Sequence, residues 1–318
     1  MKRMNKIICL IVLLACNSML FAQKTIQEFV AKTGTEKIKK GILMDAFTVP
    51  ATHKSFKDGH GKNPYFSSTE QLPDTIALIT FHINDLGFTD SWSNDFYIYY
   101  KSYAVSKSEG NEIANDIQMQ TLEGLKEEFK KRGAVLLIPS EFLDTPEKIA
   151  FYNDEFIPQV SKAGKFLSNF ENRKKDISVC ASDYRYFDMG ASFDYKRSIS
   201  LGGELADKLG VDAVLSIGVL IQTFKKETFT KSVKMSLHGP NPNPKLDKKY
   251  VGQKTGTGYY DGQLYAGGTY IFKNPIRTIL FRKDEITSIN FEGMDVIFNS
   301  FIERLYDEMN GAIEKVSK

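Results

Sequence analysis

Beyond residue 73, the chain alternates between continuous apolar runs and segments with helical spacing. The runs Thr75–Phe81 and Ala134–Ile138 are apolar and rich in β-branched residues, as is typical of strands covered on both faces. Apolar residues recur at helical spacing between them: Ile113, Ile117, Leu122, Leu125 and Phe129. Ser108 or Asn111 can cap this helix, and Gly133 ends it. Strand, helix and strand in this order predict a βαβ crossover with parallel strands.

A second round of alternation follows this unit. The predicted elements are a helix from Thr145 toward Arg173 that is interrupted at Pro158, a strand over Ile177–Cys180, a helix over Ser200–Leu209 and a strand over Val211–Ile221. Consecutive strands then replace the alternation, at Phe229–Leu237, Gln263–Phe272 and Ile276–Phe281. Short links between such strands favour antiparallel pairing.

The last predicted element is a long helix over about Phe291–Val316, with an apolar stripe from Met294 to Ile313. The whole order predicts an α/β fold (mixed α+β) with one mixed sheet, in two or three layers. Its first half holds βαβ units, and its second half holds consecutive antiparallel strands followed by the C-terminal helix. The pattern contains no linker that divides residues 73–318, so we expect these residues to form a single α/β domain.

Residues 1–22 have the pattern of a cleavable signal peptide. Lys2, Arg3 and Lys6 precede the apolar block Ile7–Ala15, which is too short for a spanning helix. Cleavage after Ala22 would leave Gln23 at the new terminus. Alternatively, Leu13-Leu14-Ala15-Cys16 resembles a lipobox, in which Cys16 would be lipidated and would anchor the protein to a membrane leaflet. Either pattern predicts export to the periplasm or cell envelope.

The segment after the signal, residues 23–72, has weak periodicity and many turn-forming residues. A short helix near Ile26–Lys32 and a strand at Ile42–Val49 are its only predicted elements. We expect an irregular lead-in that packs on the main domain.

Charge and cysteine content limit the function classes. The whole chain carries +3, and the signal contributes three basic residues and no acid, which leaves 3 − 3 = 0 for the mature part. A neutral protein lacks the basic surface of a nucleic-acid binder. Cys180 is the one cysteine after Cys16, so the mature chain has no internal disulfide, and Cys180 is expected to be a small buried apolar residue.

The segment ELADKLGVDAVLSIG, Glu204–Gly218, carries a resemblance to known families. A helix that ends in Leu-Gly-Val-Asp and leads into a strand that ends near glycine resembles envelope proteins of the curli-secretion-lipoprotein type and the N-terminal domain of Tol-system periplasmic proteins. By element order the resemblance covers about residues 73–316. It implies a non-enzymatic role in envelope assembly, transport or secretion. The membrane-inserting hairpins of the curli pore are not evident in the sequence, so pore formation is not implied.

Motifs for metal, cofactor or acyl-transfer chemistry are missing. The four histidines show no close pairing of the kind that metal sites use, and no Gly-x-Ser-x-Gly segment occurs. Gly252–Gly258 is rich in glycine and contains lysine and threonine, but it lies between predicted strands and not before a helix, as a phosphate loop would. The sequence therefore predicts neither a metal nor a cofactor.

Polar residues follow the first three predicted strands, and they are the candidate binding residues. If these strands are parallel and adjacent, their ends converge on one rim of the sheet, where open α/β sheets bind ligands. The candidates are His82, Asp85, Ser140 and Asp183, with Tyr184 and Trp92 within reach. The alternative is that Asp85, Ser140 and Asp183 only form turns. On the binding hypothesis, replacing both Asp85 and Asp183 by Ala weakens the binding of a partner or ligand and leaves thermal stability nearly unchanged.

Two aromatic-rich segments, Phe88–Tyr100 and Tyr184–Phe187, have a composition enriched at binding hot spots; the alternative is a strand packed on the core. The leading expectation is an exported, envelope-associated interaction or assembly protein without catalysis. Its partner would be an envelope protein, with no nucleic acid, and it would touch the membrane only if Cys16 is lipidated. The alternatives are an exported hydrolase and a small-ligand-binding module with its site at the strand carboxyl ends.

Overall fold

The computed structural model describes residues 25–44, 72–93, 98–155, 177–187, 195–225, 227–239, 263–282 and 285–317. The first-half elements are α2 (Ile26–Thr33), α3 (Thr35–Gly41), β1 (Leu43–Met44), β2 (Thr75–Asp85), β3 (Phe88–Ser93), β4 (Ile98–Tyr103), α5 (Lys107–Lys131), β5 (Val135–Leu137), α6 (Pro139–Phe142), α7 (Pro146–Ala150) and a π-helical turn (Phe151–Glu155). The second-half elements are β6 (Ile177–Cys180), α9 (Tyr195–Leu209), β7 (Ala213–Phe224), β8 (Glu227–Gly239), β9 (Gln263–Arg282), β10 (Glu285–Ile289) and α10 (Met294–Ser317). The predicted signal peptide, with Cys16, Ala22 and Gln23, lies outside the described residues.

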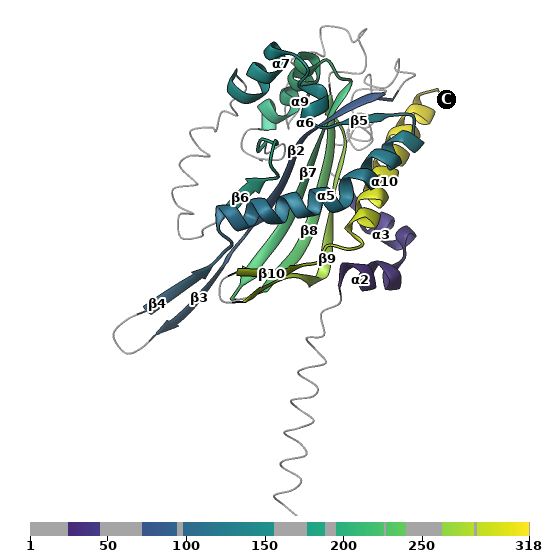
Figure 1. Cartoon of the computed structure of the whole chain (residues 1–318). Coiled ribbons are helices and arrows are strands. Elements are labelled where there is room, and N and C mark those ends of the chain that lie inside the picture. The colour runs from purple at the N-terminus through teal and green to yellow at the C-terminus, as the bar shows by residue number, and fades with distance from the viewer. Residues whose placement is uncertain are drawn as a thin grey trace, which may run out of the picture.

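The described strands form one large mixed sheet and one separate hairpin. The main sheet has the order β1-β9-β8-β7-β2-β5, with β6 also paired to β2 and β10 to β9, whereas β3 and β4 form a two-stranded sheet (Figure 1). β2 runs parallel to β5 and β7, and β7, β8 and β9 are antiparallel neighbours. The predicted α/β class with a mixed sheet is therefore confirmed, as is the parallel crossover.

One strand runs in the opposite direction from the prediction. β6 pairs antiparallel with the last four residues of β2, so the first three strands are not all parallel. β5 occupies the other end of the same edge of β2. β5 is the last strand in the order of the main sheet, so it is an edge strand. Its residue Val135 is 56% exposed, so β5 is not covered on both faces as predicted.

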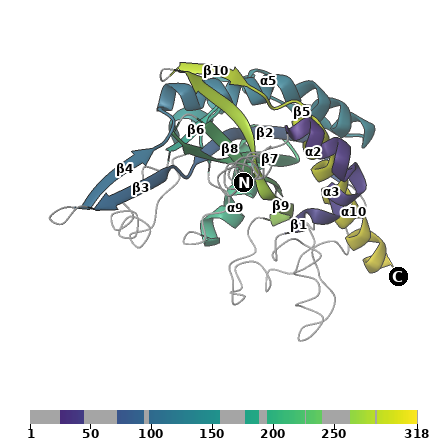
Figure 2. The same cartoon turned by 90° about the horizontal axis from the view of Figure 1, so that it is seen from below.

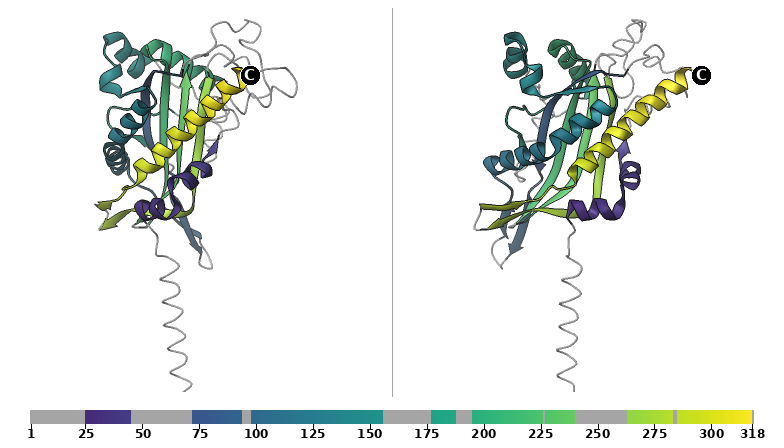
Figure 3. Two further views of the ribbon diagram at one scale, coloured as in Figure 1. Left: turned by 90° about the vertical axis from the view of Figure 1, so that its right-hand side faces the viewer. Right: turned by 45° about the vertical axis from the view of Figure 1, so that its right-hand side comes forward.

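The apolar face of the sheet lies beneath α5 and α10, which cross it side by side (Figure 3). The stripe of α10 predicted from the sequence is buried there: Met294, Ile297, Phe298, Phe301, Leu305 and Met309. Phe298 packs edge-on against Phe81 of β2, with ring centroids 6.1 Å apart. This interface is the largest apolar cluster of the fold.

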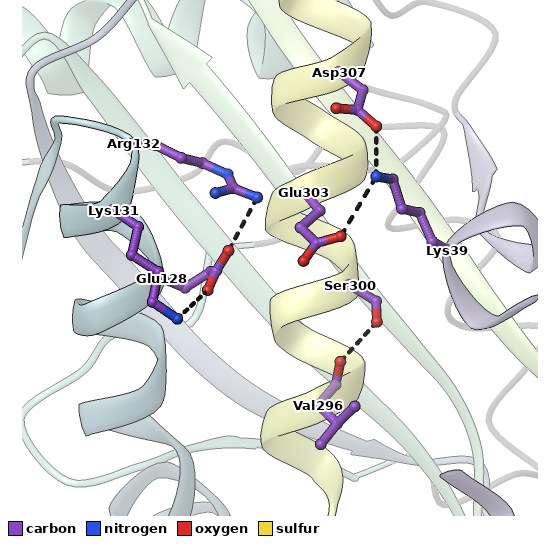
Figure 4. Close-up of polar contacts among 8 residues, drawn as sticks. All are labelled: Lys39, Glu128, Lys131, Arg132, Val296, Ser300, Glu303 and Asp307. Atoms are coloured by element: carbon purple, nitrogen blue, oxygen red, sulfur yellow. Dashed lines mark hydrogen bonds and ion pairs between the residues drawn. The ribbon is translucent and has the colours of Figure 1, made fainter. Parts of the chain in front are cut away.

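The lead-in segment is more regular than predicted. α2 confirms the predicted short helix, and α3 follows it directly. Ile26 and Ile38 are fully buried in the main core, and β1 pairs with β9. Lys39 of α3 bridges to α10 through Glu303 at 3.4 Å and Asp307 at 2.7 Å (Figure 4). Residues 25–44 are therefore part of the packed body.

Two other details differ from the sequence prediction. Ser106, and not Ser108 or Asn111, caps α5, because its side chain accepts from the backbone of Glu109 while the Glu109 carboxylate accepts from the backbone of Ser106. β9 is continuous over the two strands predicted at Gln263–Phe272 and Ile276–Phe281. Its register against β8 shifts there, with Ser232 opposite Ile271 and Thr230 opposite Ile276, so extra residues bulge without ending the strand.

The opposite face of the sheet carries a second, smaller cluster and a set of polar residues. α9 covers part of this face (Figure 2), where its Leu205 and Leu209 pack with Val214 of β7. Beside this cluster the sheet presents small or polar side chains in matching register. Thr80, Ser216 and Ser236 form one cross-strand row, and His82, Gly218 and Lys234 form the next. We call these six residues the polar rows.

Candidate functional site

The β3–β4 hairpin stands apart from the main sheet. In Figures 1 and 2 it projects away from the body formed by the sheet and its helices. Within the described residues its strands pair only with each other. In its register Phe88 lies opposite Tyr103, Asp90 opposite Lys101 and Trp92 opposite Tyr99. The predicted candidate Trp92 is therefore in the outer part of the hairpin, away from the ends of the main strands.

Asp85 fixes the base of the hairpin. Its carboxylate accepts hydrogen bonds from the backbone N–H groups of Gly87 at 2.9 Å, Val105 at 2.9 Å and Thr223 at 3.0 Å. The residue is completely buried. These bonds join the two strands of the hairpin to β7, where the chain leaves and re-enters the body. Asp85 therefore has a structural role, and we now expect its removal to lower stability, contrary to the sequence-based prediction.

An aromatic cluster surrounds the same base. Phe224, the last residue of β7, contacts Phe88 and Tyr103, with ring centroids 4.6 and 5.5 Å away. The ammonium of Lys101 lies 5.1 Å from the centre of the Tyr103 ring, and that of Lys225 lies 4.9 Å from the Phe224 ring. Phe88 remains 38% exposed. We call Phe88, Tyr103 and Phe224, with the two lysines, the hairpin root.

The predicted common rim does not form. Asp85 lies opposite Ile177 at the beginning of β6, whereas Asp183 follows the end of that strand. Because β6 is antiparallel to β2, its carboxyl end points away from the end of β2. Asp85 and Asp183 are consequently separated by the length of β6 and do not converge.

The carboxyl ends of β5 and β6 instead face each other along the middle of β2. Tyr152 fills the interval between them, because its hydroxyl donates to the Ile79 carbonyl at 2.7 Å and accepts from the Arg185 N–H at 3.0 Å. Ala181 donates to the Phe81 carbonyl at 2.9 Å. The gap in the edge of β2 is thus closed by hydrogen bonds.

The remaining candidates lie around this interval. Ser140 is exposed in the first turn of α6, and Asp183 is exposed with a φ of 67°. Tyr184 packs against the main apolar core, and burial raises the pKa of its hydroxyl. Tyr186 instead crosses to the other face and contacts His82 edge-on at 4.9 Å. Ser140 thus follows the carboxyl end of β5 and Asp183 follows that of β6, and these two ends face each other. Tyr184 and His82 lie on opposite faces of the sheet.

His82 belongs to the polar rows. Its Nδ1 lies 3.2 Å from Thr80 Oγ1, which is in turn 4.0 Å from Cys180 Sγ. Gly218 leaves space for the ring, since a methyl group there would come within 2.6 Å of His82 Nε2. Burial raises the pKa of Cys180 to about 11, so its thiol is protonated at neutral pH. The prediction that Cys180 is a buried small residue is confirmed.

Sequence reasoning missed Phe224, Lys101 and Lys225 of the hairpin root. The alternation in residues 88–93 and 98–103, on either side of Asn94 and Asp95, is a hairpin signal that could have located two strands there. Phe224 carried no comparable signal, because its role depends on where β7 ends relative to the hairpin.

No family model, no curated protein and no solved structure matches this chain. Within the described ranges, no helix combines the length and apolar content that crossing a membrane requires. The described side chains also include no group of three or more His, Cys, Asp or Glu residues placed to hold a metal ion.

Proposed function

We propose that this is an exported, envelope-associated binding protein without catalysis, and that the β3–β4 hairpin is its partner-binding element. The observation that carries the proposal is a hairpin that projects from the body and pairs with no other described strand. The partner class is an envelope protein that offers an extended segment to the hairpin.

The energetics of an isolated hairpin support this proposal. A two-stranded ribbon is at best marginally stable in water, and its outer N–H and C=O groups are a ready template for another strand. Addition of a partner strand would satisfy these groups by β-augmentation. The Asp85 hydrogen bonds and the hairpin root hold the ribbon in a fixed direction, which lowers the ordering cost of binding.

The aromatic composition of the hairpin supports the same role. Trp92 and Tyr99 occupy facing register positions, and Tyr100 follows. Tyrosine and tryptophan combine large contact area with a polar end and are enriched among residues that dominate binding energy.

The test is photo-cross-linking in intact cells with a photoreactive amino acid placed at Trp92 or Tyr99. We expect a discrete adduct from these positions. Met119 of α5, which is 67% exposed, is the matched control and should give none. Equal adducts at all three positions, or no adduct from the hairpin, would contradict the proposal. A Trp92→Ser, Tyr99→Ser double variant should lose the partner yet unfold at the temperature of the parent.

Export is proposed from the sequence and has its own test. Mass spectrometry of protein from the envelope fraction should find an N-terminus at or near Gln23. A diacylglycerol-modified Cys16 would instead make the protein membrane-anchored. An intact Met1 terminus on cytoplasmic material would refute export altogether.

An exported enzyme is the second candidate. The observation that most favours it is the series of contacts from Cys180 to Thr80 and from Thr80 to His82. A cysteine and a histidine are the residue types of an activated thiol. Burial, however, raises the pKa of the Cys180 thiol, whereas a nucleophilic cysteine requires a lowered one. We therefore expect the purified protein to show no activity that depends on Cys180, and an activity that Cys180→Ser abolishes would favour the enzyme.

A further inference from the structure

His238 is a buried histidine whose ring has no hydrogen-bond partner. It lies near the end of β8, in register between Val214 of β7 and Leu264 of β9, and is 3% exposed. Neither Nδ1 nor Nε2 meets a donor or acceptor among the residues described. Buried polar groups are nearly always hydrogen-bonded, so an unpartnered imidazole calls for a physical explanation.

α9 lies directly against this histidine. Gly202 of α9 passes so close that a methyl group on it would overlap the Cβ of His238. The next turns of the helix bury Leu205 and Leu209 in the second apolar cluster. α9 therefore lies against the His238 side chain, and its movement away from the sheet would open a path for water to the ring.

The surrounding charges disfavour a protonated ring. Lys234, on the same strand and the same face, is the ionisable group that acts on it. On α9, Glu204, Asp207 and Lys208 are exposed. Immediately before β7, the Asp212 carboxylate is occupied by the backbone and side chain of Thr75. The facing part of β9, residues 263–268, contains no acidic or basic side chain except the Tyr265 phenol.

We propose that His238 is a proton-operated latch: the neutral ring keeps α9 on the sheet, and protonation of the ring releases the helix. Burying a charged imidazole without a partner is energetically costly, and movement of α9 would relieve that cost by hydrating the ring. Release uncovers Leu205, Leu209 and Val214, so the acid form presents an apolar surface that the neutral form hides. This inference does not depend on the role of the hairpin.

The direction of the pH dependence follows from the two protonation equilibria. Burial, with a contribution from Lys234, lowers the pKa of His238 from 6.5 to about 3 in the docked state. Between these two values the released state binds more protons than the docked state. The docked state therefore loses stability as pH falls from about 6.5 toward 3, and it is fully stable above that window.

Hydrogen exchange of the mature chain tests the latch. The equilibrium constant for opening of α9, obtained after correction for intrinsic exchange rates, should be on the order of 100-fold larger at about pH 4.5 than at about pH 7.5. The factor follows because the lower pH is about two units below the pKa of a free histidine. Amides of α10 should show no comparable change. Exchange that rises equally in both helices would indicate global acid unfolding and would overturn the proposal.

Variants separate the latch from other acid effects. His238→Gln and His238→Leu, which do not titrate in this range, should remove the pH dependence of α9 exchange. His82→Gln is the matched control, because His82 is also buried but has Thr80 as a partner, and it should keep that dependence. Retention of the full effect in both His238 variants would refute the latch.

Nuclear magnetic resonance of ring-labelled histidine in the parent protein keeps the proposal testable if those variants do not fold. The His238 ring should stay neutral for as long as the α9 amides are protected, and should charge only as protection is lost. A ring that titrates near pH 6.5 while α9 remains protected would overturn the proposal.

Discussion

The main sheet and the β3–β4 hairpin are both antiparallel in large part, yet they are stabilised in different ways. Strands β2, β7 and β8 are buried almost throughout, and α5 and α10 cover one face of the sheet. The hairpin is anchored through the Asp85 hydrogen bonds and the ring contacts of Phe224. Its outer register pairs, up to Ser93 and Ile98, extend from that base.

This difference separates folding from the proposed binding role. Burial of apolar area is the dominant favourable contribution to folding, and in this molecule it is concentrated in the body. The two described apolar clusters contain no residue of β3 or β4, so the hairpin can carry residues suited to a partner. We therefore expect the effect of substitutions on stability to fall from the buried core of the body to the base of the hairpin, and to be smallest at an ion pair on the surface.

The largest effect is expected in the body, at Leu305 of α10. This side chain is 1% exposed in the main core, so Leu305→Ala should lower the free energy of unfolding by about 2 to 5 kcal/mol. Urea unfolding measures the change. Met119→Ala, at an exposed site on α5, should stay within about 0.5 kcal/mol. Equal effects at the two positions would show that the α10 stripe is not core.

Asp85 should give the next largest effect. Asp85→Ala leaves three backbone N–H groups without their acceptor, at about 1 kcal/mol each, and so costs about 3 kcal/mol of unfolding free energy. Asp183→Ala, at an exposed carboxylate, is the control and should cost less than about 0.5 kcal/mol. If both variants unfold together at the same urea concentration, Asp85 does not anchor the hairpin.

Substitution of Phe224 tests the stability of the hairpin root separately from that of the body. Phe224→Ala removes two edge-on ring contacts, each worth roughly 0.5 to 1.5 kcal/mol, and should cost about 1 to 3 kcal/mol. Hydrogen exchange should increase in β3 and β4 more than in β8. Phe224→Leu keeps apolar contact and should be milder; uniform loss of protection across the sheet would contradict a local root.

The smallest effect is expected at Lys39, which fastens α3 to α10 at the surface. Lys39→Met removes both ion pairs and should cost about 0.5 kcal/mol, the range of exposed pairs. High salt should erase the difference because it screens such pairs. Lys126→Met, which breaks the 2.7 Å pair with Glu141, is the control of similar size. A loss near that of Leu305→Ala would mean that the lead-in depends on this contact.

The sequence by itself determined the class of fold and the long elements of the body. Continuous apolar runs identified β2 and β7, and helical spacing identified α5 and α10, because a buried strand and an amphipathic helix each impose their own periodicity. Thr25 and Glu28 at the start of α2, and Ser106 and Glu109 at the start of α5, show that helix ends also follow local hydrogen bonding. These features depend on residues close together in the chain.

Tertiary structure alone decided which residues meet. The direction of β6 cannot be read from Ile177–Cys180, since a strand of four residues can pair in either direction, and that direction separates Asp85 from Asp183. The backbone N–H groups that donate to Asp85, as far along the chain as Thr223, and the contact of Gly202 with His238 also join distant segments. Local sequence periodicity fixes which face a residue occupies, but packing between distant elements fixes its neighbours, and the candidate sites are made of such neighbours.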